Sequence, residues 1–205
     1  MQQEPIWNRK EAMAPVEDRP GLPRVLLIGD SISIGYTLLV REMLKDVANV
    51  HRIPENGGPT RNGVEKLEGW LGAGKWDVIH FNFGLHDIRR LDGGQWQVSM
   101  SEYEGNLRRI VARLKKTGAK LIFAATTPVP EGKLGVARVP GDEVTYNGIA
   151  ARVMKENGVE WSDLHVYTRG KLADWQLPAN VHFHDEGSRA LATRVAGVIR
   201  AALKR

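Results

Sequence analysis

Short apolar runs alternate with amphipathic stretches along most of this chain, and that alternation constrains its fold more than any other feature. Continuous apolar runs of this length are typical of parallel strands, which helices bury on both faces. The runs are Val25 to Ile28, Val50 to Ile53, Val78 to Phe83, Leu121 to Ala125 and, more weakly, Val159 to Leu164. The sequence therefore predicts a mostly parallel sheet of five strands.

The stretches between these runs have the periodicity of helices that pack on a sheet. In the clearest one, apolar residues recur at spacings of three and four and a glycine follows: Leu107, Ile110, Val111, Leu114 and Gly118. The last segment repeats the pattern with Leu191, Val195, Val198, Ile199 and Ala202, after Gly187 and Ser188. We predict a three-layer α/β/α sandwich of the flavodoxin-like type. In such folds, ligands bind at the carboxyl ends of the strands.

The chain, at 205 residues, is long enough for one well-buried domain. Residues 1–22 are rich in proline and have little periodicity, so we expect an N-terminal arm across the domain, with regular structure beginning at Arg24. Residues 23–205 form the predicted single domain. The segment 126–142 is the longest predicted loop, and it follows a strand's carboxyl end, where it could shape a substrate pocket.

Composition excludes several classes of protein and partner. The chain has no cysteine, so disulfides and thiolate metal sites are ruled out. The net charge of +5 is spread along the sequence, and its densest cluster is predicted to be a solvated helix face: Arg108, Arg109, Arg113, Lys115 and Lys116. We therefore expect no nucleic-acid partner.

No apolar stretch is long enough to cross a bilayer, so we expect no membrane partner. Residues 1–19 are polar and charged, unlike a signal peptide. Two compartments fit this sequence: the cytoplasm, or the outside of the cell if a signal peptide is absent from this chain. The oligomeric state is not readable from the sequence.

A serine lies where a nucleophile would be expected in this fold. The segment Gly29 to Ser33 reads GDSIS, directly after the first predicted strand and before a helical pattern. Ser31 would therefore lie near a helix N-terminus, whose free N–H groups favour a developing anion. An N-cap serine beside a structural aspartate is the alternative for this fragment. A catalytic serine would require a histidine within hydrogen-bond reach.

Four segments in the right order resemble the conserved blocks of the SGNH or GDSL-type hydrolase superfamily. They are Gly29 to Ser33, Asn56 to Thr60, Gly84 to Asp87, and Val181 to Phe183 with Glu186 to Ser188. The resemblance covers residues 24–203 and implies a serine esterase with Ser31 as the nucleophile and His182 as the base. It implies no cofactor and no metal.

The resemblance also implies an oxyanion hole formed by Ser31, Gly58 and His86. Gly58 is chosen for its position before Pro59 and Thr60. His86 replaces the asparagine usual in the third block. An imidazole N–H can donate the same hydrogen bond, but its role then depends on the tautomer and on pH.

The acid of the expected triad is missing from its usual place. Three residues before His182 the chain has Ala179, and the next residue is Asn180 rather than aspartate. Asn180 or a backbone carbonyl could orient His182 in a Ser–His dyad, a carboxylate such as Asp185 or Asp174 could reach it, or the enzyme could be impaired.

Three other kinds of protein compete with the esterase. A metal site could use His182, His184, His86 and Asp87. A non-catalytic, glycan-binding relative would explain Asn180 and His86, and a fluorophosphonate probe would discriminate it. A flavodoxin-like nucleotide binder would need a glycine-rich phosphate loop, whereas segment 29–36 has glycine only at positions 29 and 35.

The substrate predicted from the sequence is a small ester, with O-acetyl groups on carbohydrate first and a generic short acyl ester second. Several tryptophans are candidate platforms for sugar rings, although a tryptophan is more often core: Trp70, Trp76, Trp96, Trp161 and Trp175. The absence of a long apolar lid stretch argues against long-chain lipids.

Overall fold

A five-stranded, all-parallel sheet forms the centre of the molecule in the computed structural model, which describes residues 5–204. Its strands are β1 (Arg24–Ile28), β2 (Asn49–Arg52), β3 (Val78–Phe81), β4 (Lys120–Ala124) and β5 (Glu160–Ser162). They lie in the order β2-β1-β3-β4-β5. All five predicted strands are present, and the fold class predicted from the sequence is confirmed.

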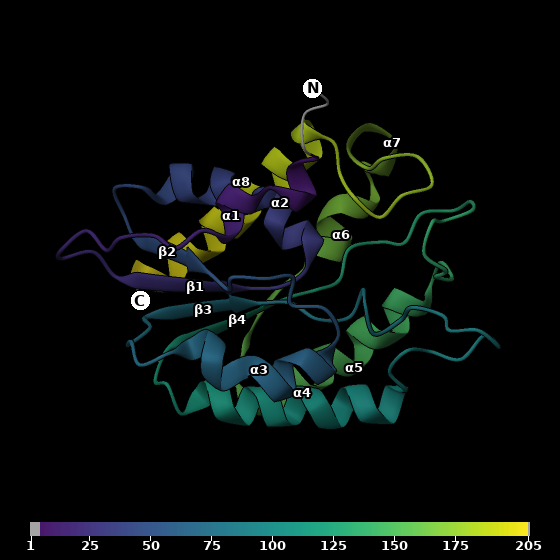
Figure 1. Ribbon diagram of the computed structural model, residues 1–205, viewed down its shortest axis with the longest axis horizontal. Helices are drawn as coiled ribbons and strands as arrows, with labels where there is room; N and C mark the ends of the chain where they lie inside the picture. The colour runs from purple at the N-terminus through teal and green to yellow at the C-terminus, as the bar shows by residue number, and fades with distance from the viewer. Residues whose placement is uncertain (1–4, 205) are drawn as a thin grey trace.

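Helices cover both faces of the sheet, as Figure 1 shows. One layer contains α1 (Lys10–Met13), α2 (Ser31–Leu44) and α8 (Asp185–Lys204). The other contains α3 (Thr60–Leu71), α4 (Met100–Lys115) and α5 (Asp142–Asn157). Two short helices, α6 (Leu164–Arg169) and α7 (Leu172–Trp175), lie between β5 and α8. Both faces of β1 and β3 are therefore buried, which explains their continuous apolar sequences.

Helix α4 illustrates how the local sequence sets an element. Ser99 caps its first turn by accepting from the Glu102 N–H at 3.3 Å, and Gly118 follows its last turn with a φ of +74°. The predicted apolar stripe is buried against the sheet: Leu107, Ile110, Val111 and Leu114. The spacing of apolar residues and the capping residues in the sequence thus agree with the bounds of α4.

The N-terminal arm is more ordered than the sequence predicted. A 3₁₀ turn, η1 (Ile6–Asn8), and α1 precede β1, so the expectation that regular structure begins at Arg24 is wrong. Both pack against α2, where the Arg41 guanidinium donates to the carbonyls of Glu11 (3.0 Å) and Ala14 (3.2 Å). The spacing of apolar residues in the sequence cannot predict these hydrogen bonds to backbone carbonyls. Residues 1–4 of the predicted arm lie outside the described residues.

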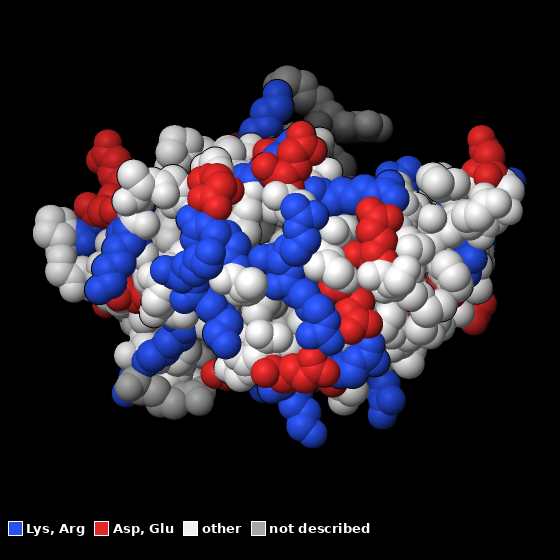
Figure 2. Space-filling view, turned by 90° about the horizontal axis from the view of Figure 1, so that it is seen from below, with Lys and Arg blue, Asp and Glu red and all other residues white. Residues whose placement is uncertain are grey.

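The basic cluster predicted as a helix face lies along α4. Figure 2 views the molecule from below and shows basic side chains with acidic ones between them. Arg108 pairs with Glu104 and Glu156, each at 2.7 Å, and Arg113 pairs with Glu68. These contacts fit a solvated face. No helix between residues 5 and 204 is long and apolar enough to span a membrane.

Candidate active site

Ser31 is the first residue of α2, directly beyond the carboxyl end of β1. Asp30 caps this helix, since its carboxylate accepts from the Ile32 N–H at 2.9 Å. The N–H groups of a first helical turn have no intrahelical acceptor, so the Ser31 amide can serve an anion. The alternative of an N-cap serine is therefore wrong, because Asp30 caps the helix and leaves the Ser31 hydroxyl free for another partner.

A buried arginine holds the loop that carries Ser31. Arg52 is the last residue of β2, where it pairs with Leu27 of β1, and it is 6% exposed. Its guanidinium donates to the carbonyls of Gly29 (2.7 Å) and Asp30 (3.1 Å) and to the Ser33 hydroxyl (2.9 Å). It also donates to the carbonyls of the next loop, at Ile53 (2.9 Å) and Glu55 (2.7 Å). One side chain therefore fixes two loops at the same edge of the sheet, a connection that the sequence analysis missed.

His182 reaches Ser31 from the loop between α7 and α8. Its Nε2 lies 2.9 Å from the Ser31 Oγ, across 151 positions of sequence. An antiparallel bridge between Gln176 and Phe183 shapes this loop, and the Leu177 N–H donates to the His182 carbonyl at 2.9 Å. The structure thus brings together the two residues that the sequence analysis paired.

Asn180 is the partner of the other ring nitrogen of His182. Its Oδ1 lies 2.7 Å from His182 Nδ1 and 3.1 Å from the His182 backbone N–H. A backbone N–H can only donate, so the shared atom must be the amide oxygen, and Nδ1 must carry the proton. The lone pair on Nε2 then points at Ser31, which is the arrangement in which an imidazole can take the proton of a hydroxyl.

The alternative acids do not contact His182. Neither Asp185, at the start of α8, nor Asp174, in α7, forms a hydrogen bond or ion pair with it in the structure of residues 5–204. The residue at the family's usual acid position, Ala179, has a φ of +47°. This left-handed conformation makes a tight turn immediately before Asn180. Asn180 is thus the described side chain that orients the ring.

His182 is held in its neutral form. Burial lowers the pKa of His182 to about 4, the Asp30 carboxylate opposes this shift, and Arg138 and His86 act in the same direction as burial. A base that is neutral across the physiological range can accept a proton there.

His86 and Arg138 lie near enough to His182 to influence its pKa. Arg138 comes from the predicted pocket loop, and its Nε donates to the Leu85 carbonyl at 2.7 Å. Burial lowers the pKa of His86, and lowers that of Arg138 to about 10, while Asp30 raises both. The ring of His86 forms no hydrogen bond with any residue from 5 to 204. It is therefore available to a ligand.

The amide of Gly58 already has an acceptor. Its N–H donates to the Asn56 side chain at 3.0 Å. Its φ of +62° is a left-handed conformation that favours glycine, and a Cβ added there would also displace the Asn62 side chain. To serve as an oxyanion donor, this N–H would have to share or exchange its bond with Asn56.

The tryptophan that touches the site is one that the sequence analysis did not single out. Trp7, in η1, stacks on His182 with ring centroids 4.6 Å apart and an interplanar angle of 13°. Two proposed sugar platforms are wrong for that role, since Trp70 and Trp76 are buried at 7% and 5% exposure. The sequence analysis missed Trp7 because this residue lies in the proline-rich arm, where apolar residues show no regular spacing.

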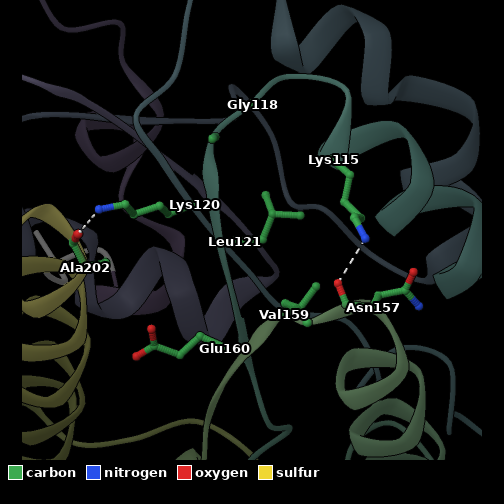
Figure 3. A pocket seen from close by; sticks show the side chains of 10 residues that line it. Lys115, Gly118, Lys120, Leu121, Asn157, Val159, Glu160 and Ala202 are labelled. Atoms are coloured by element: carbon green, nitrogen blue, oxygen red, sulfur yellow. Dashed lines mark hydrogen bonds between the residues drawn. The ribbon is translucent and has the colours of Figure 1, made fainter. Parts of the chain in front are cut away.

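A cavity of substantial volume lies away from Ser31. It has a volume of about 430 Å³ and opens at the amino ends of β4 and β5, opposite the edge that carries Ser31 (Figure 3). Its lysines are already bonded to carbonyls, Lys120 to Ala202 (2.7 Å) and Lys115 to Asn157 (3.0 Å). Within the described chain, no group of three or more His, Cys, Asp or Glu side chains could hold a metal ion, including the set around His184.

Fold and site together define a hydrolase of carboxylic esters on an α/β/α sandwich. The chain belongs to the GDSL-like lipase/acylhydrolase family, whose model matches residues 27–190. This confirms the resemblance seen in the four sequence blocks.

Solved structures of esterases share the fold. The lipase/acylhydrolase from Enterococcus faecalis superposes with a TM-score of 0.75 at 20% identity, covering 88% of this chain and 96% of that one. An acetyl xylan esterase, AlAXEase, gives 0.73 at 18% identity, with coverage of 86% and 99%. Axe2, an acetylxylan esterase from Geobacillus stearothermophilus, gives 0.69 at 19% identity, with coverage of 86% and 94%. No curated protein matches this chain in sequence.

Proposed function

We propose that this protein hydrolyses short acyl esters, above all O-acetyl groups on carbohydrate, through a covalent acyl intermediate on Ser31. The observation that carries the proposal is the hydrogen-bonded series from Ser31 Oγ through His182 to Asn180 Oδ1, at 2.9 and 2.7 Å. It combines a hydroxyl at a helix N-terminus with an imidazole whose accepting nitrogen faces that hydroxyl.

In the first half of the proposed reaction, Ser31 Oγ attacks the ester carbonyl carbon and its proton passes to His182 Nε2. The bond from that carbon to the alcohol oxygen then breaks, and the alcohol leaves with the proton from Nε2. In the second half, water attacks the acyl group and gives its proton to Nε2. Ser31 leaves as the hydroxyl, and the acid is released.

The oxyanion of each tetrahedral intermediate would be held by the N–H groups of Ser31 and Gly58 and by the ring of His86. The Ser31 N–H lies at the start of α2 and is free of the helix's own hydrogen bonds. The Gly58 N–H would exchange Asn56 for the substrate oxygen. The positive charge of Arg138 favours the same oxyanion.

Two kinds of observation support an acetyl ester of carbohydrate as the substrate. Two of the similar solved structures are acetyl xylan esterases by name. In addition, the cavity lined by Asp30, Ile32 and Ser33, the chain neighbours of Ser31, has a volume of only about 10 Å³, too small for a long acyl chain.

Labelling with a fluorophosphonate probe tests the nucleophile. We expect the wild-type protein to be labelled, Ser31→Ala to lose labelling, and the exposed-serine control Ser101→Ala on α4 to be labelled like the wild type. A folded wild-type protein that resists the probe would favour the non-catalytic, glycan-binding alternative instead.

Rates on acetylated xylo-oligosaccharides and on 4-nitrophenyl esters of rising chain length test the substrate. We expect kcat/KM to fall steeply beyond the acetyl ester and to be highest on the oligosaccharide. Activity on the aryl acetate alone would indicate a generic short-chain esterase, and a preference for long chains would contradict the proposal.

A further inference from the structure

Trp7 is joined to the active site by a stacking contact that the hydrolytic mechanism does not use. Its indole lies nearly parallel to the His182 ring, at 13° and 4.6 Å. The turn that carries it, η1, packs on α2, the helix that begins with Ser31. Gly35 on α2 faces this turn, since a Cβ added there would lie 3.9 Å from the Trp7 Cα. The arm thus presents an aromatic face to the proposed base.

His182 lacks the charged partner that usually accompanies a catalytic imidazole. The Asn180 amide oxygen fixes the tautomer but carries no net charge, so it cannot balance the imidazolium that forms when Ser31 gives up its proton. Of the neighbouring groups that influence the ring, the Asp30 carboxylate favours the imidazolium, whereas Arg138, and His86 when it is protonated, oppose it. The site therefore needs another source of stabilisation for the charged ring.

An aromatic face can supply this stabilisation. A cation within about 6 Å of an indole centroid gains roughly 0.5–2 kcal/mol, and Trp is the strongest aromatic partner. A stacked ring also restricts rotation of the imidazole about its Cβ–Cγ bond, so that Nε2 stays aligned with Ser31 Oγ.

We propose that Trp7 is a positioning residue of this site, whose indole face holds the His182 ring in line with Ser31 and stabilises the imidazolium that Asn180 cannot neutralise. This inference rests on the proposed function. It assigns the N-terminal arm a part in catalysis, although the arm contributes no reacting atom.

Kinetics of two substitutions at Trp7 test the proposal. With 4-nitrophenyl acetate, Trp7→Leu should lower kcat by about 3- to 30-fold, the factor that corresponds to a lost cation–π contact, with KM changed less than twofold. Trp7→Phe keeps an aromatic face and should recover most of the loss. The matched control is Ile6→Ala, which trims the same turn without removing the indole and should keep kcat within twofold.

A second measurement separates the stack from simple docking of the arm and needs no turnover. Leu and Phe both cover the His182 ring, but only Phe offers a π face, so NMR titration should give His182 a higher pKa in Trp7→Phe than in Trp7→Leu. In an Asn180→Asp background, where a carboxylate balances the charge, Trp7→Leu should cost less in kcat than it does alone.

The proposal is overturned if Trp7→Phe behaves like Trp7→Leu in both kcat and the pKa of His182, or if Ile6→Ala loses as much activity as Trp7→Leu. Failure of the proposed function would look different. The wild-type protein would then show no turnover and no fluorophosphonate labelling, while the NMR comparison would still report whether the stack stabilises the charged ring.

Discussion

At the scale of single residues, Asn180 determines which part of a triad this site retains. In a Ser–His–Asp triad the carboxylate selects the tautomer of the imidazole and also stabilises its charged form. The amide oxygen of Asn180 accepts from both the Nδ1 and the backbone N–H of His182, so tautomer selection is kept. Stabilisation of the charged imidazole by a carboxylate is lost. In the proposed mechanism the site is therefore a Ser–His dyad with an orienting amide.

We predict that Asn180→Asp raises kcat on 4-nitrophenyl acetate by roughly tenfold, because a hydrogen bond to a charged acceptor is stronger by about 1–2 kcal/mol. The carboxylate should also raise the pKa of His182. The acid limb of the kcat/KM profile, expected near the pKa of about 4 in the wild type, should then move to higher pH. Asn157→Asp, which adds the same charge at the end of α5, should change neither quantity. An unchanged kcat in folded Asn180→Asp would mean that charge at Nδ1 does not limit the reaction.

At the scale of elements, the site depends on loops at one sheet edge that hydrogen bonds hold in fixed positions. Arg52 connects the β1–α2 loop to the β2–α3 loop. Asp87, in the loop after β3, accepts from the Thr60 N–H (2.9 Å) and hydroxyl (2.5 Å) at the start of α3. Three consecutive βα connections are thereby joined. Each of these polar residues is buried, so its bonds act in a medium of low dielectric constant.

We predict that Arg52→Met lowers the free energy of unfolding by about 2–4 kcal/mol, because it leaves several buried oxygens without donors. It should also slow fluorophosphonate labelling, since Gly29 and Asp30 position Ser31. Arg52→Lys should not rescue either property, because an ammonium lacks the planar fork that reaches both loops. Urea unfolding and labelling rates measure the two effects. Arg113→Met, which removes an arginine of α4 that pairs with Glu68 and, within residues 5–204, has no contact with the site loops, is the control for labelling.

At the scale of the whole molecule, two buried titratable groups make the free energy of unfolding depend on pH in opposite directions. His80 on β3 is fully buried, and its ring nitrogens have no partner among the described residues. Burial lowers the pKa of His80 to about 4. Its contribution is fully present above about pH 6.5 and is lost as the pH falls toward 4. Burial raises the pKa of Asp87 to about 7, so stability from that group falls as the pH rises from about 4 to 7.

We predict that His80→Leu removes the loss of unfolding free energy that His80 causes at acid pH. Compared with the variant, the wild type should lose roughly 3 kcal/mol of unfolding free energy between pH 6.5 and 4, at about 1.4 kcal/mol per pH unit. The difference between the two proteins isolates His80, because Asp87 is common to both. Urea unfolding across this range measures it. Equal differences at pH 7 and pH 4 would refute the assignment.

The sequence by itself determined the layers of this protein and the identity of the proposed reacting pair. Apolar runs and helical periods are local properties of the chain, so they located all five strands, and the four blocks identified Ser31 and His182. Only the tertiary structure decided that Asn180 orients His182, that Asn56 occupies the Gly58 amide and that Trp7 covers the ring. These contacts join segments through loops and an arm without periodicity. Their partners are set by packing in three dimensions, which no spacing along the chain records.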